Sequence, residues 1–292
     1  MFKGSIVAMV TPFKDDKVDE NTLKDLVEFY IKNSTSALVP CGTTGESATL
    51  TYEEHDRVIE VVIQQSKGRI PVIAGTGSNS TQEAIILTQH AERVGANASL
   101  QVAPYYNRPT QKGLYEHFKA ISESVKIPIV LYNIASRTGV NIEPETIAKL
   151  AKDCKNIAGV KEASGSLEQM ARIKMLCPEE FCLLSGEDAL TLPALSIGAS
   201  GVISVVANIV PRDVANLVSE FQKGNLEKAG NLHYQLMPLI KAMFVETNPI
   251  PLKTAMGLLK MCRPDLRLPL CSMSDENLAK LKKALRDYGL LE

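Results

Sequence analysis

Short apolar runs alternate with amphipathic stretches along most of the chain. Eight of these runs are rich in small and β-branched residues, and we expect them to be strands: residues 5–10, 37–40, 71–75, 98–102, 128–132, 157–161, 182–185 and 201–205. Runs of this kind are typical of parallel strands that are buried on both faces.

A helix-like segment follows each predicted strand. Apolar residues at helical spacing between positions 23 and 31 predict the first helix. Thr51, Ser80 and Ser166 each stand three residues before a Glu or Gln, which is the pattern of a capping box at a helix start. Further helices are expected over residues 113–124, 147–151, 188–197 and 211–223.

Eight strand–helix units within residues 1–224 match the number and size of a (β/α)8 TIM barrel of the α/β class. A doubly wound open sheet is the competing architecture. We favour the barrel because the units are regular and no Gly-x-Gly-x-x-Gly motif follows the first strand. Residues 225–292 contain only helical patterns, so we expect a small C-terminal helical region packed on the barrel or a neighbouring subunit.

Composition and charge exclude several function classes. The 292 residues carry a net charge of -1, only 5% are aromatic and none is tryptophan, so we expect no nucleic-acid partner. We also expect no membrane partner, because no apolar run is long enough to span a bilayer. The six cysteines form no Cys-x-x-Cys pair, and the N-terminus does not resemble an export signal. Free thiols and a cytoplasmic location are therefore expected.

Lys161 ends the apolar run 157–161 and precedes a serine- and glycine-rich turn. A charged ammonium is costly to bury, which favours the neutral amine near neutral pH. A neutral amine can attack a carbonyl and form a Schiff base. The alternative is a strand-end lysine whose tip reaches solvent or pairs with a carboxylate.

Other polar residues follow the ends of neighbouring predicted strands, where TIM-barrel active sites lie. They are Thr43 and Thr44, Tyr105 and Tyr106, Tyr132, and Arg137. Each has an ordinary structural alternative, such as a turn, loop packing, a core tyrosine or a solvated cation. Together, on one rim beside a strand-end lysine, they indicate an active site.

The chemistry of a lysine imine suggests roles for these residues. Thr44 has a hydroxyl and a backbone N–H that can hold the carboxylate of a 2-oxo acid. The imine must lose a proton to become an enamine, and Tyr132 can move that proton with Thr43 and Tyr106 as a relay. Arg137 suits the carboxylate of an aldehyde acceptor.

Four motifs then identify a resemblance: residues 42–47, residues 104–109, Tyr132-Asn133 with residues 136–139, and residues 159–163. In their order and spacing the chain resembles the dihydrodipicolinate synthase family of class I pyruvate-dependent lyases and aldolases, from the N-terminus through Asn248-Pro249-Ile250-Pro251. The resemblance implies a homotetramer, built as a dimer of dimers, that condenses pyruvate with L-aspartate 4-semialdehyde to 4-hydroxy-tetrahydrodipicolinate. That reaction serves lysine and diaminopimelate biosynthesis and needs no cofactor or metal.

The resemblance also implies residue roles. It makes Lys161 the Schiff-base residue and Tyr132 the general acid and base, with Thr43 and Tyr106 as the rest of the proton relay. Thr44 and the backbone of Ile203 would contact pyruvate, and Arg137 would be the gate for the semialdehyde. Gly186 would lie near the same pocket. Tyr106 would reach in from the adjacent subunit. Two positions depart from the family or stand out: Ala135 replaces a common proline, and Cys41 precedes the Gly-Thr-Thr loop.

Lysine-sensitive members of the family bind lysine at a dimer interface. The matching positions here are Ser47, Ala48, His55, Asn79, Glu83 and Tyr105. Glu83 would carry the ammonium of the ligand, although its capping-box role competes for the same carboxylate. A lone helical histidine such as His55 is usually a surface residue, and Tyr52 replaces a histidine of some sensitive relatives. We expect lysine to inhibit this protein.

Three alternatives stay open on the sequence alone. N-acetylneuraminate lyase and 2-keto-3-deoxy sugar acid aldolases share the lysine and tyrosine, but Arg137 and the paired threonines favour the synthase. A metal-dependent aldolase needs clustered ligands, whereas the four histidines are scattered along the chain. A third alternative is a non-catalytic barrel that senses a 2-oxo acid or lysine. The presence of every proposed catalytic group argues against it.

Overall fold

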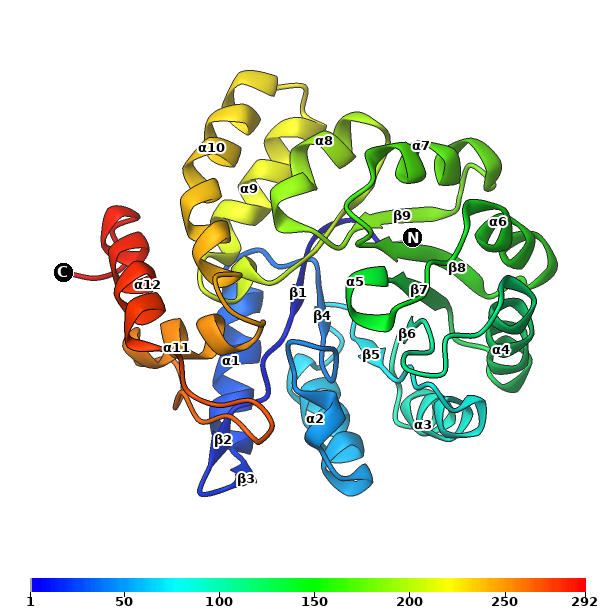
Figure 1. Ribbon diagram of the computed structural model, residues 1–292, viewed down its shortest axis with the longest axis horizontal. Coiled ribbons are helices and arrows are strands. Elements are labelled where there is room, and N and C mark those ends of the chain that lie inside the picture. The colour runs from blue at the N-terminus through cyan, green and yellow to red at the C-terminus, as the bar shows by residue number, and fades with distance from the viewer. Residues whose placement is uncertain (1) are drawn as a thin grey trace.

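The computed structural model describes residues 2–292 and has the expected barrel of eight parallel strands with helices around it (Figure 1). The barrel strands are β1 (Gly4–Ala8), β4 (Ala37–Val39), β5 (Ile73–Gly75), β6 (Ala98–Val102), β7 (Ile129–Asn133), β8 (Ile157–Glu162), β9 (Cys182–Ser185) and β10 (Gly201–Ser204). Their order is β4-β1-β10-β9-β8-β7-β6-β5, and a single parallel bridge between Leu38 and Val72 links the two end strands. The predicted TIM barrel is confirmed.

Helices cover the outside of the strands (Figure 1). They are α1 (Glu20–Lys32), α2 (Tyr52–Ser66), α3 (Thr81–Arg93), α4 (Gln111–Ser124), α6 (Pro144–Asp153), α7 (Leu167–Leu176), α8 (Thr191–Ser196) and α9 (Pro211–Gln222). The one-turn helix α5 (Ala135–Thr138) instead lies near the middle of the ring, directly after β7 (Figure 1). Short 3-10 turns stand at Ser47–Thr49, Asp188–Leu190 and Val206–Asn208. The small hairpin of β2 (Phe13–Lys14) and β3 (Lys17–Val18), which the sequence analysis did not predict, turns through Asp15 and Asp16.

Strand side chains alternate between the barrel interior and the helix layer. Val130 and Tyr132 of β7 belong to the same interior cluster as Ile203 of β10, whereas Leu131 packs in the layer between strands and helices. The same alternation in β8 places Val160 in that outer layer, so Lys161 points into the barrel. The interior is therefore apolar except where the strand ends carry functional groups.

The predicted capping boxes differ in outcome. At α2 the box is complete: the Thr51 hydroxyl accepts from the Glu54 N–H, and the Glu54 carboxylate accepts from the Thr51 N–H. Ser80 and Ser166 also accept at the N-termini of α3 and α7, but the side chains three residues later do not return the bond. That half of the prediction is wrong, because Glu83 and Gln169 bind partners elsewhere in the fold.

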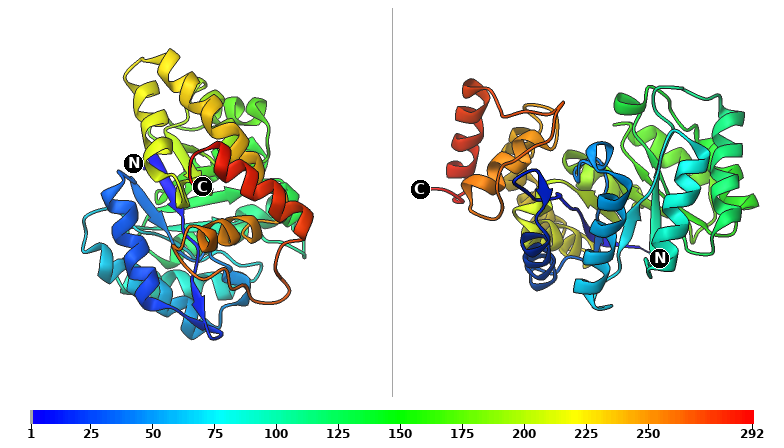
Figure 2. Two further views of the ribbon diagram at one scale, coloured as in Figure 1. Left: turned by 90° about the vertical axis from the view of Figure 1, so that its left-hand side faces the viewer. Right: turned by 90° about the horizontal axis from the view of Figure 1, so that it is seen from below.

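The C-terminal region is helical, as expected, with α10 (Leu226–Met243), α11 (Ile250–Leu258) and α12 (Asp275–Asp287). Leu236 and Leu239 of α10 and Leu281 of α12 are buried in the same core as the N-terminal half of the barrel. α10 packs along α9, and α12 packs on α10 and α11 at the edge of the molecule (Figure 2). The division between residues 224 and 225 stays a prediction.

No helix within residues 2–292 combines the length and the apolar character that crossing a bilayer requires.

Candidate active site

Lys161 and Tyr132 lie side by side in the barrel because their strands pair in register. β7 and β8 are neighbours, and Tyr132 is the register partner of Lys161. The Lys161 Nζ lies 4.1 Å from the centroid of the Tyr132 ring, and the two residues are only 6% and 5% exposed. Among residues 2–292, neither the ammonium nor the phenol hydroxyl has a hydrogen-bonding partner. Both polar tips are free for a ligand.

The surroundings of Lys161 are more polar than its strand suggests. Glu187 and Asp188 follow β9, and both are close enough for the charge of Lys161 to favour their ionised forms. Burial nevertheless raises the pKa of both carboxyl groups. Asp188 accepts from the N–H groups of Val205 and Val206, which ties this acidic pair to the end of β10. The apolar strand is thus only part of the lysine's environment.

A buried carboxylate joins β7 and β8 on their outer face. Glu162 is fully buried and accepts from the Asn133 amide at 3.0 Å, the Gln169 amide at 2.9 Å and the Ser164 N–H at 2.7 Å. Asn133 and Glu162 are the register pair immediately after Tyr132 and Lys161. Their bond therefore supports the pairing that brings the lysine and tyrosine together.

Gly186 lies directly against Lys161. A Cβ atom added at Gly186 would stand 2.6 Å from the Ala163 Cβ and 3.1 Å from the Lys161 Cε. The first contact is too short to exist without a shift of Ala163, and the second is a tight one. The structure thus places Gly186 beside the lysine, and it places Ile203 inside the barrel, where β10 pairs with β1.

Residues 41–47, which we call the threonine loop, carry Thr43 and Thr44. The Thr44 hydroxyl accepts a 3.0 Å bond from the Asn248 amide, and Arg137 donates to the Asn248 carbonyl at 3.0 Å. Asn248 therefore links the threonine loop to Arg137. No role for Asn248 could be predicted from the residue alone, although its place in an Asn-Pro-Ile-Pro motif was a signal.

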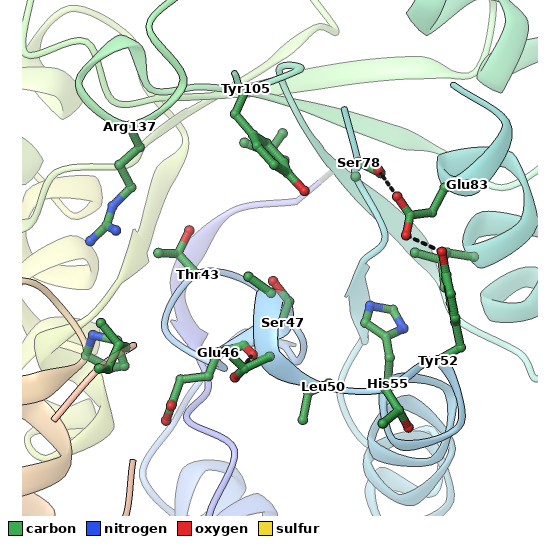
Figure 3. A pocket seen from close by; sticks show the side chains of 18 of the residues that line it. Thr43, Glu46, Ser47, Leu50, Tyr52, His55, Ser78, Glu83, Tyr105 and Arg137 are labelled. Carbon is green, nitrogen blue, oxygen red and sulfur yellow. Dashed lines mark hydrogen bonds between the residues drawn. The ribbon is translucent and has the colours of Figure 1, made fainter. Parts of the chain in front are cut away.

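A cavity of about 780 Å³ opens beside this loop (Figure 3). Thr43, Arg137 and Asn248 line one part, and Tyr52, His55 and Glu83 line another. Figure 3 shows Thr43 and Arg137 toward one side, and Tyr52 and Glu83 pointing at one another on the other. Lys161 and Tyr132 are not among the lining residues. The cavity therefore joins the proposed semialdehyde and lysine-binding residues rather than exposing the amine itself.

Glu83 is held at the cavity wall by side chains of this chain. Tyr52 donates to one carboxylate oxygen at 2.5 Å, and Ser78 donates to the other. The bond to Glu83 raises the pKa of the Tyr52 phenol. The competition with a capping box, which the sequence suggested for Glu83, is absent because Ser80 caps α3 alone.

The ordinary alternative for His55, a surface histidine on a helix, does not hold, because the side chain is buried. His55 is 5% exposed, and its Nε2 lies 2.9 Å from the Gly75 carbonyl. The helical pattern could not show that this face of α2 turns toward the end of β5. His55 is still a cavity residue, as are Ser47 and Ala48.

Tyr105 and Tyr106 separate at the loop after β6. Tyr105 lines the cavity, and its carbonyl accepts from the Asn79 amide at 3.1 Å. Tyr106 is 92% exposed, has a left-handed φ of 71° and does not line the cavity of its own chain. Among residues 2–292, no hydrogen bond joins Tyr132, Thr43 and Tyr106, so the relay stays a prediction.

The two unusual positions have simple structural accounts. Ala135 opens the one-turn helix α5, which carries Arg137. Cys41 is buried, its thiol lies 3.5 Å from the His55 carbonyl, and burial raises its pKa. Cys41 is therefore a small buried side chain that fills space at the base of the threonine loop.

A sequence model described as the Dihydrodipicolinate synthetase family matches residues 1–288. The 4-hydroxy-tetrahydrodipicolinate synthase of Endomicrobium trichonymphae is 59% identical over 292 residues, which is 100% of both chains.

Two solved structures share the fold. Dihydrodipicolinate synthase from Aquifex aeolicus superposes with a TM-score of 0.98 at 51% identity and 99% coverage of both chains. The enzyme from Cyanidioschyzon merolae with lysine bound superposes with a TM-score of 0.96 at 43% identity, again with 99% coverage of both.

Proposed function

The chain belongs to the dihydrodipicolinate synthetase family, and we propose that it condenses pyruvate with L-aspartate 4-semialdehyde to 4-hydroxy-tetrahydrodipicolinate. It is a class I lyase whose reaction serves lysine and diaminopimelate biosynthesis. The observation that carries the residue assignment is the pairing of Lys161 with Tyr132, two buried residues whose polar tips have no hydrogen-bonding partner among residues 2–292.

The first steps use the amine. Nζ of Lys161 attacks the keto carbon of pyruvate, the carbonyl oxygen leaves as water, and an imine forms. Loss of a proton from the methyl carbon then gives the enamine. Tyr132, whose ring lies beside Nζ, is the group placed to move these protons, with Thr43 and Tyr106 completing the relay.

The later steps use the second substrate. The enamine carbon attacks the aldehyde carbon of the semialdehyde, whose oxygen takes up a proton. The amine of the semialdehyde then attacks the imine carbon, closes the ring and releases Lys161. Thr44 and the Ile203 backbone hold the pyruvate carboxylate, and Arg137, exposed at the cavity wall, holds that of the semialdehyde.

A substrate comparison tests this assignment. We expect turnover with pyruvate and L-aspartate 4-semialdehyde and none with N-acetylmannosamine as the acceptor. Arg137→Ala should still form the pyruvate imine but lose turnover, because the acceptor carboxylate is no longer held. Normal turnover by Arg137→Ala would contradict the role given to this arginine.

We propose further that lysine binds among Ser47, Ala48, His55, Asn79, Glu83 and Tyr105 and inhibits the enzyme. The support is that most of these residues line one cavity with the carboxylate of Glu83 turned toward it (Figure 3). A bound ammonium would take the place of the Tyr52 or Ser78 hydroxyl at that carboxylate. L-lysine at millimolar concentration should lower turnover at saturating pyruvate, and Glu83→Gln should abolish the effect. Equal inhibition of both proteins would reject this site.

The assembly and location are also proposals. A homotetramer, as a dimer of dimers, is supported by the exposed ring of Tyr106, which a neighbouring subunit would cover. A cytoplasmic location is supported by the six free cysteines.

A further inference from the structure

One ion pair in this fold is completely buried and lies outside the catalytic set. The Lys253 ammonium is 2.6 Å from the Glu46 carboxylate, and the two side chains are 0% and 1% exposed. Lys253 comes from α11, whereas Glu46 belongs to the threonine loop, only two residues after Thr44. A buried charge pair carries a large desolvation penalty, so its presence here calls for a role beyond stability.

Every polar atom of this pair is used. Lys253 also donates to the Thr11 carbonyl at 2.9 Å and lies over the Phe13 ring, 4.1 Å from its centroid. The second Glu46 oxygen accepts from the Arg267 N–H at 3.2 Å. Burial lowers the pKa of Lys253, and the charge of Glu46 opposes that shift. The pair is therefore the centre of a fixed cluster that joins the C-terminal region to the threonine loop.

The threonine loop needs contacts that hold it in place, because its backbone is strained. Glu46 has a φ of 54°, in the left-handed region that residues other than glycine, Asn and Asp rarely adopt. Conformations of this kind persist where surrounding contacts hold them, and they gather at functional sites. Two further contacts act on the same stretch: Thr11 donates to the Gly45 carbonyl at 2.7 Å, and Asn248 donates to Thr44.

We propose that the buried Glu46–Lys253 pair positions the threonine loop, so that Lys253, far from the reacting atoms in sequence, sets the affinity for the keto-acid carboxylate. Because Thr44 is the pyruvate contact in the proposed function, this inference rests on it. Both residues are positioning residues. Glu46 lines the cavity, but the polar contacts of the pair are with each other, with Thr11 and with the Arg267 N–H rather than with Lys161 or Tyr132. The role of this ion pair is to fix the geometry of the threonine loop rather than to stabilise the barrel.

Three variants distinguish a role in positioning the threonine loop from a role in stabilising the fold. Lys253→Met leaves the Glu46 carboxylate buried and unpaired, so it should lower the melting temperature and raise the KM for pyruvate. Glu46→Gln keeps the shape of the side chain and should raise the KM with a smaller loss of stability. In the double variant the unpaired charge is gone, so stability should recover while the KM stays high. Misplacement of a substrate contact changes such constants by roughly 10- to 100-fold.

The experiment measures melting temperature, KM for pyruvate and KM for the semialdehyde, with kcat expressed per Lys161 that borohydride and pyruvate can trap. Lys280→Met, which breaks an exposed ion pair with Glu276, is the matched control and should change none of them. If Lys253→Met does not fold, Glu46→Gln and the double variant decide the question.

Two results are distinguishable. A double variant whose KM for pyruvate returns to the wild-type value together with its stability would overturn the positioning role. Failure of the wild-type enzyme to trap pyruvate on Lys161 would instead overturn the proposed function. The comparison of KM values between the variants depends on that function.

Discussion

Lys161 and Tyr132 stand apart in the sequence by an entire strand–helix unit, and the register of β7 and β8 brings them together. A strand-end lysine and tyrosine on consecutive strands could be recognised from the sequence because parallel strands end at one rim. Asn248 and Lys253 could not be placed in this way. Their partners in the threonine loop lie 204 and 207 positions earlier, and no local pattern records such contacts.

His117 supplies a prediction for single residues. It lies in α4 with its Nδ1 2.9 Å from the Thr81 hydroxyl, and burial lowers its pKa from 6.5 to about 4. Between these two pKa values the imidazole binds a proton in the unfolded chain but stays neutral in the folded chain. The contribution of His117 to the free energy of unfolding is therefore fully present above pH 6.5 and is lost as the pH falls toward 4. Between pH 7 and pH 5 the loss is about 2 kcal/mol.

His117→Asn should remove that part of the acid destabilisation. Urea unfolding of both proteins at pH 7 and pH 5 gives the measurement, because the difference between their pH effects isolates this one group. The same loss of unfolding free energy in wild type and variant would show that His117 does not titrate in this range.

At the scale of elements, the eight strands and most helices could be predicted from apolar runs and capping signals. Thr51 and Glu54 form the complete capping box because both partners are local. Glu83 and Gln169 do not form the capping-box hydrogen bond, because their side chains bind Tyr52 and Glu162, which belong to other elements. Local signals thus predict where a helix begins but not where its side chains turn.

The pairing of β7 with β8 depends on the buried Glu162. In Glu162→Gln an amide N–H₂ group would face the amides of Asn133 and Gln169, so donors would meet donors. An unsatisfied buried polar group costs about 1–3 kcal/mol. We expect a lower unfolding free energy and, because Tyr132 shifts against Lys161, a roughly 10-fold lower kcat.

Glu276→Gln, at an exposed position of α12, is the control for that experiment. If kcat per trapped site stays at the wild-type value while Glu162→Gln loses stability, the outer-face contacts support the barrel without aligning the catalytic pair.

At the scale of the whole molecule, the barrel brings the loops after all eight strands to one rim, and the C-terminal helices pack on one side of it (Figure 2). The sequence indicated both parts. It could not show that Asn248, Lys253 and Arg267 of the C-terminal region hold the threonine loop, because that arrangement depends on how the region folds back. Catalytic geometry is thus a property of the entire chain.

Assembly supplies a prediction at this scale. Tyr106 is exposed and does not line the cavity of its own chain, so we expect it to serve the site of a neighbouring subunit. Chains with Lys161→Ala and chains with Tyr106→Phe, produced together, would then form mixed pairs in which one of the two sites is intact. Each mixed pair should regain about half of the wild-type activity. No activity beyond that of the separate variants would place Tyr106 in its own subunit's site.

The central claim is that Lys161 bonds covalently to the keto acid, and reductive trapping tests it most directly. Borohydride added with pyruvate should inactivate the enzyme and add the mass of pyruvate, less one water and plus two hydrogen atoms, to the peptide that contains Lys161. Lys161→Ala should gain no such mass. An adduct on another side chain, or none in an enzyme that turns over normally, would contradict the account.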